Sequence, residues 1–279
     1  MTTRERIDLR PLTGWDEEYV ERHQADPNTA RLCNEVLARC LVAPGADPAG
    51  ARETVRELLV AERDRELVEL RRLSLGPDVS ARVPCPACGE TSEADFSLDV
   101  LPLGFEPPPR RLTVDVDDVG EVELRLPTAG DQEDLLDAAL DGEAEQRSWL
   151  LARCIERFGD RRDGLDLAFA RDLPVRVRAA LESAIESALP DLDLEMAVEC
   201  SHCGAPITAP FDVPSFFFFE LRDRAAGLLA DVHRLARAYH WSERDILSLT
   251  LRRRFAYLLL LEEEVDALLL AEVESTGSP

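Results

Sequence analysis

Two Cys-x-x-Cys motifs carry the clearest chemistry in this chain of 279 residues. Cys85 and Cys88 stand in "PCPACG", and Cys200 and Cys203 stand in "CSHCG". Thiols spaced in this way bind metal ions, form disulfides or undergo thiol exchange. In both motifs glycine follows the second cysteine, where it can take a positive φ and let backbone N–H groups turn toward sulfur. Each motif alone supplies only two of the four ligands of a tetrahedral zinc site.

An internal repeat relates the two motifs. Their cysteines lie 115 positions apart, and the same offset aligns other residue types. The aligned pairs are Thr13 with Thr128, Asp16 with Asp131, Glu18 with Glu133 and Phe96 with Phe211. One position off, at 114, "LARC" at 37–40 recurs at 151–154. Because separate coincidences would not share one offset, the pattern predicts a duplicated unit of about 115 residues.

The duplication predicts one shared zinc site. If the two copies pack around a twofold axis, Cys85, Cys88, Cys200 and Cys203 supply four thiolates to one structural Zn²⁺. The 111 residues between the motifs far exceed the usual spacing of a compact ribbon, so the pairing depends on the repeat. Two half-sites completed by a dimer, or redox-active or inert thiols, stay open. A closed four-thiolate site has no position for water and would join the copies without doing catalysis.

The remaining cysteines and histidines are expected to be bystanders. Cys33, Cys40 and Cys154 lie in apolar helical contexts and are expected to be buried, inert thiols. His202 lies between the two cysteines of the second motif, where the inner residue of such a turn is expected to be exposed. The spacing of His233 and His240 could suggest a metal pair, but they flank an ordinary apolar helix stripe.

Short sequence patterns predict the helices, strands and loops around these residues. Strand-like segments at 7–12 and 122–126 each precede a Thr with an acid three residues on, which resembles a helix capping box. Helical periodicity follows at 55–75 and 174–189. Further segments with their own composition are a Pro/Gly/Ala loop at 43–50, a Pro-rich connector at 103–110 and a helical C-terminal part.

We therefore predict a mainly helical α+β fold with three regions. They are a first repeat with its zinc knuckle at 1–105, a second repeat with its knuckle at 111–214, and a C-terminal helical extension at 215–279. The knuckles are expected to form one zinc-ribbon-like site. In the extension Ser242, with Asp245 three residues on, is expected to cap a helix. One helix face there is expected to hold Phe218, Leu221, Ala225, Leu228, Val232, Leu235 and Tyr239.

Charge restricts the partners. The chain has 32 Arg, no Lys and 56 acidic residues, a net charge of −24. Such a protein repels phosphate backbones, so nucleic-acid binding is not expected. Residues 215–256 are locally basic, with eight Arg against five acids, which favours docking onto a protein. Neither a signal peptide nor an apolar run long enough to span a membrane is apparent, so we expect a cytoplasmic protein with no membrane partner.

No enzyme motif is found. The sequence lacks a dinucleotide-binding glycine pattern, a phosphate loop and a nucleophile elbow. Acid clusters at 115–118 and 262–264 are more typical of solvated faces than of metal cages. The arginines at 252–254 could form a phosphate patch, but a solvated helix start or a contact with an acidic partner is favoured. We expect the protein not to be an enzyme.

Two segments resemble a known family. "LRPLTGWDEEYV" at 9–20 is similar to a segment of the baseplate hub assembly chaperones of T-even contractile-tail phages. Residues 200–260 resemble relatives encoded with bacterial contractile injection systems. The residues that carry this second likeness are Val232, His233, Leu235, Ala236, Tyr239, Trp241, Ser242, Glu243, Ile246, Leu247, Arg253, Arg254 and Tyr257.

The resemblance implies a non-enzymatic role in building the baseplate hub of a phage tail-like contractile injection particle, with hub or spike proteins as partners. The C-terminal helices, with the phenylalanines at 216–219 and Trp241, would then bind the client. Those phenylalanines could equally fill the core behind the second knuckle. A permanent structural component of the baseplate, or less favourably a zinc-ribbon regulator that binds nucleic acid, are the alternative functions.

Overall fold

The computed structural model describes residues 7–42, 47–100, 108–117, 119–189, 195–210 and 212–276. Helices predominate, as predicted, and the strands are short. The helices are α1 Gly14–Arg22, α2 Thr29–Cys40, α3 Pro48–Arg56, α4 Val60–Leu75, α5 Ala129–Asp137, α6 Glu143–Cys154, α7 Leu167–Asp172, α8 Val175–Ala188, α9 Val213–Ala226, α10 Leu228–Tyr239, α11 Glu243–Leu247 and α12 Leu251–Thr276, with a 3-10 turn η1 at Leu98–Val100.

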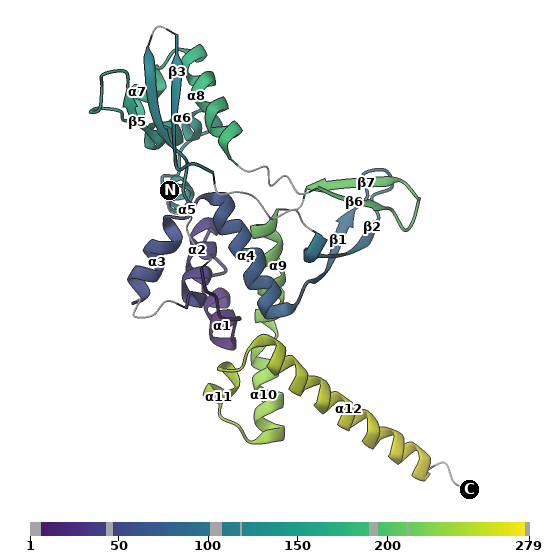
Figure 1. Ribbon diagram of the computed structural model, residues 1–279. Helices are drawn as coiled ribbons and strands as arrows, with labels where there is room; N and C mark the ends of the chain where they lie inside the picture. Colours follow the sequence, from purple (N-terminus) through teal and green to yellow (C-terminus); the bar gives the residue numbers. More distant parts are fainter. Residues whose placement is uncertain are drawn as a thin grey trace.

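The strands form three small antiparallel sheets. They are β1 Asp78–Pro84 with β2 Thr91–Ser97, then β3 Arg111–Val116, β4 Gly120–Arg125 and β5 Ile155–Phe158 in that order, and finally β6 Glu195–Glu199 with β7 Pro206–Pro210. In Figure 1 the two hairpins lie side by side on one flank of the molecule, whereas the three-stranded sheet lies with α6, α7 and α8 at one end.

The first hydrophobic core contains residues that lie far apart in the sequence. Helices α1, α2 and α4 supply buried side chains such as Val20, Val36 and Leu67, and α9 adds Phe217 and Phe218 to the same cluster. The first helix of the predicted C-terminal extension thus packs within the core of the first repeat (Figure 1). The sequence left open whether the phenylalanines at 216–219 fill the core behind the second knuckle. Phe217 and Phe218 are buried, but in this helical core and not in the core of the hairpins.

A second core lies between the three-stranded sheet and α6, α7 and α8. Val122 and Leu124 of β4 face Leu151 of α6 and Val177 and Leu181 of α8. Alternating burial in a half-covered strand and the 3–4 spacing of apolar residues in α8 explain which side chains meet there. The predicted helix at 174–189 is confirmed as α8.

The last helices form a smaller third core. Leu228, Val232 and Leu235 of α10 pack against α11 and the start of α12. Most of the apolar residues predicted to share one helix face in this region are buried. They lie on two helices rather than one, because Gly227 separates α9 from α10. Ser242 caps α11 by accepting a hydrogen bond from the N–H of Asp245, as predicted. Beyond this core α12 extends away from the rest of the molecule (Figure 1).

Three local predictions need correction. Residues 7–12 form only an isolated bridge between Leu9 and Leu41, because the end of this segment turns to other partners: the N–H of Leu12 donates to the hydroxyl of Ser74, and the carbonyl of Leu12 accepts from the N–H of Leu251. The helix predicted at 55–75 is interrupted between α3 and α4, where the carbonyl of Leu58 accepts a hydrogen bond from the N–H of Ala129. The predicted loop at 43–50 is partly helical because Asp47 caps α3, and Pro48 fits its first turn.

Other predicted features lie outside the described residues, namely positions 43–46, most of the Pro-rich connector and Phe211. Within the described part of the chain, no helix has the length and apolar character needed to cross a bilayer.

Candidate metal centre

The first Cys-x-x-Cys forms the turn of the β1–β2 hairpin. Pro84 pairs with Thr91 at the end of the ladder, and the chain between them reverses direction. The N–H of Cys85 donates to the carbonyl of Glu90 at 2.8 Å, and the N–H of Gly89 donates to the carbonyl of Cys85 at 2.9 Å. Gly89 has φ +78°, a conformation that a residue with a Cβ rarely adopts.

The second motif repeats this turn between β6 and β7. The N–H of Cys200 donates to the carbonyl of Ala205 at 2.9 Å, and the N–H of Gly204 donates to the carbonyl of Cys200 at 2.9 Å. Gly204 has φ +71°. The positive φ predicted for the glycine after each second cysteine is therefore confirmed at both sites.

The two turns bring all four sulfurs together. The Sγ atoms of Cys85 and Cys203 are 3.8 Å apart, those of Cys88 and Cys200 are 3.7 Å apart, and all four lie within 4.8 Å of one another. Cys85 and Cys200 are buried, while Cys88 and Cys203 lie at the surface. The four predicted ligands thus converge within one chain.

The donor set fits a tetrahedral metal ion. Zinc–thiolate bonds of about 2.3 Å place the corners of a tetrahedron about 3.8 Å apart, and the two closest sulfur pairs are separated by 3.8 Å and 3.7 Å. Each sulfur pair joins one cysteine from each motif, so neither hairpin could hold the ion alone. Four soft sulfur donors with this geometry favour zinc or iron over hard cations.

The electrostatics of the cluster require a cation if all four thiols are to ionise. A hydrogen bond from Ser92 is the main cause that lowers the pKa of Cys200 to about 5. The pKa of Cys88 is instead raised to about 12, because desolvation and the neighbouring thiols outweigh a backbone hydrogen bond from Glu90. Thiolates this close repel one another, and a bound divalent ion removes that repulsion.

Ser92 is a residue of this centre that the sequence did not indicate. Its side chain is 1% exposed, and its hydroxyl donates to the sulfur of Cys200 at 3.4 Å. The same oxygen accepts a hydrogen bond from the N–H of Ser201 at 3.1 Å. One serine of the first hairpin therefore holds the second knuckle in place, as residues behind metal ligands commonly do.

Beneath the sulfurs the two hairpins share a small apolar core. Val83 and Ala94 of the first hairpin pack with Ile207 of the second and with the inner cysteines. This contact buries the inner side of the cluster, where Cys85 and Cys200 lie, away from water.

Two ionic clusters repeat around the predicted capping boxes. Arg10 donates to both carboxylate oxygens of Asp16 at 2.7 and 3.1 Å, and the N–H and hydroxyl of Thr13 donate to the same group at 2.9 Å each. Arg39 adds a hydrogen bond at 3.2 Å. The arginines were not singled out from the sequence, although their spacing from the acid could have indicated them.

The second cluster has the same members. Arg125 donates to Asp131 at 2.5 and 2.7 Å, Thr128 donates at 2.9 and 3.0 Å, and Arg153 donates at 3.2 Å. Asp131 is 2% exposed. Burial raises the pKa of Asp131, but the hydrogen bonds from Arg125 and Thr128 outweigh it and lower the pKa to about 2.

Other candidate residues lie away from the metal centre. Cys33, Cys40 and Cys154 are buried as predicted, and burial raises the pKa of each to about 12. His202, His233 and His240 are exposed. Among the described residues, the four cysteines are the one group of metal-ligating side chains that converge in this way.

The three arginines at 252–254 differ in their burial. Arg254 is 4% exposed and forms ion pairs with Glu17 of α1 and Asp231 of α10, whereas Arg252 and Arg253 are exposed. Arg254 thus fastens the start of α12 to the first helix, and only two of the three arginines can face a partner.

A mostly helical body with four cysteines gathered between two hairpins is compatible with a protein that has a metal site, but this class does not indicate a role. The chain matches the T4 bacteriophage base plate protein family over residues 2–218 and belongs to that family, which suggests a role in a phage baseplate. The match includes both Cys-x-x-Cys motifs and ends within α9. Among curated proteins and solved structures, none matches.

Proposed function

We propose that this protein is a non-enzymatic assembly chaperone for the baseplate hub of a phage tail-like contractile injection particle, and that a structural zinc ion stabilises it. The observation that carries the proposal is the match to the base plate family over residues 2–218. A baseplate role implies contact with other baseplate components. Hub or spike proteins are the proposed partners, and the cytoplasm is the proposed place of action.

The zinc ion would be held by Cys85, Cys88, Cys200 and Cys203. When bound, it supplies four metal–sulfur bonds and retains no open coordination position. Its contribution is to tie the hairpin that follows α4 to the hairpin that precedes α9. Because such binding energy appears as folding energy, the ion would fix the two halves of the chain against each other.

We also propose the internal duplication that the sequence predicts. The paired turns, the paired capping boxes and the Arg10–Asp16 and Arg125–Asp131 pairs recur at an offset of 115, and Arg39 and Arg153 recur at 114. The segment around Leu9 bridges Leu41 after α2, and Leu124 of β4 likewise pairs with Ile155 after α6. We therefore retain repeats at 1–105 and 111–214 and a C-terminal region at 215–279, whose first helix packs on the first repeat.

The C-terminal helices are the proposed surface for the client. Phe219 is 75% exposed, Leu229 is 67% exposed and Phe255 is 54% exposed. Exposed Arg252 and Arg253 lie beside Phe255 on α12. Aromatic and arginine side chains are the anchors that protein interfaces use most. The acidic body would keep a complex with an assembly-prone client soluble.

The alternative is a permanent structural component of the baseplate. The family match favours the two equally, since both contact baseplate proteins. A zinc-ribbon regulator that binds nucleic acid is the less favoured third function, because a chain with a charge of −24 repels phosphates.

A pulldown from cells that express the neighbouring genes, followed by sedimentation, tests the proposal. Recovery with soluble hub or spike proteins, together with absence from sedimented particles, is the expected result. Recovery in particles at a fixed copy number would establish the structural component instead, and recovery with neither would contradict both.

The client surface is tested in the same experiment with a variant pair. Leu229→Ser with Phe255→Ser is expected to abolish recovery of the hub protein. Val175→Ser is the control, because Val175 is 83% exposed but lies on α8. Equal recovery with both variants would place the client surface elsewhere.

A further inference from the structure

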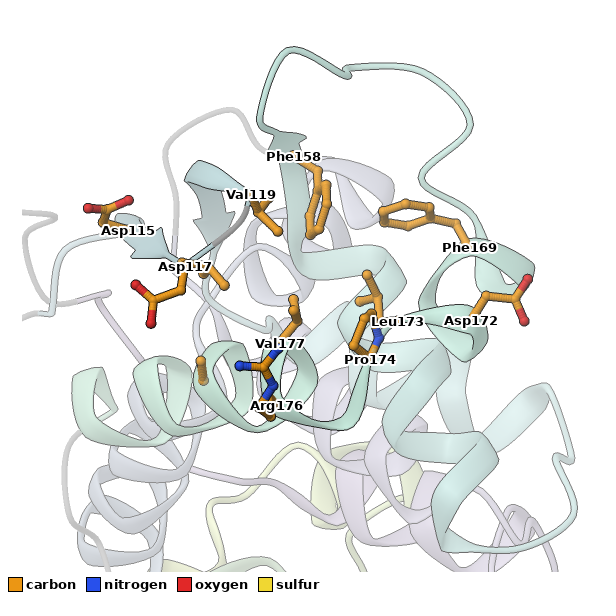
Figure 2. Close-up of a pocket in the computed structure, with 12 residues that line it drawn as sticks. Asp115, Asp117, Val119, Phe158, Phe169, Asp172, Leu173, Pro174, Arg176 and Val177 are labelled. Carbon is orange, nitrogen blue, oxygen red and sulfur yellow. The ribbon is translucent and has the colours of Figure 1, made fainter.

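The second core has a hollow of about 560 Å³ between the end of β3, α7 and the start of α8. Its lining includes the buried side chains of Val116, Leu173 and Val177. Figure 2 shows Leu173 and Val177 below the rings of Phe158 and Phe169, so the floor is apolar. The two rings meet edge to face at 5.1 Å, so the wall of the hollow is a packed aromatic pair.

Carboxylates stand at both ends of this floor. Figure 2 shows Asp115 and Asp117 at one end and Asp172 at the other. Within the described part of the chain these three side chains form no ion pair. Among the described residues of the lining the one cation is Arg176, which is outnumbered by the three acids and already has an interaction partner.

Not all acids of the second repeat are left without a cation. Asp131 and Asp134 are paired with arginines of the chain itself. Acids left without a cation around an apolar floor fit a ligand that brings its own cations and an apolar group between them.

We propose that this hollow is a second docking surface, and that it binds a segment of a partner protein in which basic residues flank a large apolar side chain. The apolar side chain covers the floor between Phe158 and Val177, and the flanking cations pair with Asp115, Asp117 and Asp172. The surface is separate from the client surface proposed on the C-terminal helices and does not depend on it.

The overall charge of the protein favours a basic partner protein, rather than a second copy of this chain, as the occupant of the hollow. Two molecules that each carry −24 repel each other, whereas a basic segment is attracted from a distance. The expected partner is therefore a protein with an exposed Arg- or Lys-rich stretch that contains Phe, Leu or Ile.

Selection from a random peptide display library on the immobilised full-length protein tests this proposal. The expected result is enrichment of peptides with a large apolar residue between basic ones. One enriched peptide, labelled with a fluorophore, is then titrated with wild-type protein and with variants, and its Kd is measured by fluorescence anisotropy.

Asp115→Asn with Asp117→Asn and Asp172→Asn is expected to raise that Kd about tenfold, the effect of losing three solvent-exposed charge pairs. Ala180→Arg, which places a bulky cation on an exposed helix position in the lining, is expected to abolish binding. The control is Asp95→Asn with Asp141→Asn and Glu186→Gln, which removes the same charge from exposed positions outside the hollow.

Three results would overturn the proposal. These are enrichment of peptides without the basic–apolar pattern, equal peptide affinity for the hollow variant and its control, and self-association in sedimentation that the hollow variant alone abolishes. The last result would make the occupant a second copy. Circular dichroism of each variant establishes that a loss of binding is not a loss of fold.

Discussion

The two predicted repeats have the same ionic cluster but different surroundings. Arg10, Asp16 and Arg39 in the first have the same hydrogen bonds as Arg125, Asp131 and Arg153 in the second. Helix α4 of the first repeat is covered by α9, whereas α8 of the second lies on a three-stranded sheet. A repeated local sequence thus fixes repeated local bonds, while the neighbours are set by the rest of the chain.

This difference determines which repeat keeps a free surface. Phe217, Phe218 and Leu221 of α9 complete the core of the first repeat. In the second repeat the end of β3 and the start of α8 are left with a hollow. The first repeat consequently depends on a helix more than a hundred residues downstream, and the second has room for a partner.

The largest effect is expected from breaking the centre that joins the repeats. Cys200→Ser should abolish zinc binding and lower the free energy of unfolding by more than about 4 kcal/mol, since metal binding contributes directly to folding. Metal analysis and urea denaturation measure both quantities. His202→Ala is the control, because its exposed side chain lies in the same turn. Unchanged zinc content and stability in Cys200→Ser would exclude a structural site.

Removing an aromatic ring of α9 tests the dependence of the first repeat on the C-terminal part of the chain. Phe217→Ala should cost about 3–5 kcal/mol of unfolding free energy, because a fully buried ring leaves a cavity. Phe219→Ala, two residues on and 75% exposed, should cost less than about 0.5 kcal/mol. Urea denaturation of the two variants measures the difference, and similar costs would contradict the packing of α9.

Neutralising the buried acid tests whether the two ionic clusters are equivalent. Asp131→Asn should lower the unfolding free energy by about 2 kcal/mol at neutral pH. The pKa of Asp131 is lowered from 3.8 to about 2, so its contribution is complete above its unfolded pKa and is lost as the pH falls toward 2. The difference between wild type and variant should therefore shrink in acid.

Asp16→Asn is the matched variant, because the hydrogen bonds from Arg10 also lower the pKa of Asp16, against the effect of burial. Urea denaturation at a series of pH values measures both variants. A difference from wild type that stays constant down to acidic pH would show that the carboxylates do not act through their charge.

The smallest effect is expected at Ser92, one of the positions at which the two hairpins differ. Ile207 occupies the corresponding position in the second hairpin and has no hydroxyl, so it cannot donate to a sulfur as Ser92 donates to Cys200. Ser92→Ala should weaken zinc binding about tenfold. Competition with a chelator measures the affinity, and Ser80→Ala on the exposed side of β1 is the control.

Features that depend on near neighbours and on the repeat could be predicted. The capping boxes at Thr13 and Thr128, the glycine after each second cysteine and the helix at 174–189 all follow from residues within a few positions of one another. The convergence of four cysteines was predicted because the second motif is an aligned copy of the first.

Features that depend on contacts between distant segments could not be predicted. Ser92 bonds to a sulfur 108 residues away, and Arg254 pairs with an acid 237 residues away. The docking of α9 and the hollow above α8 are likewise set by which apolar faces meet.

The sequence by itself determined the four candidate ligands, the turns that hold them and the capping boxes, because short-range geometry leaves those residues few other arrangements. Only the tertiary structure decided which surfaces are covered and which stay open. The free energy gained by burying an apolar face is roughly proportional to the buried area and does not depend on direction, so one apolar face could pack against any of several others. The tertiary structure shows which of these pairs form.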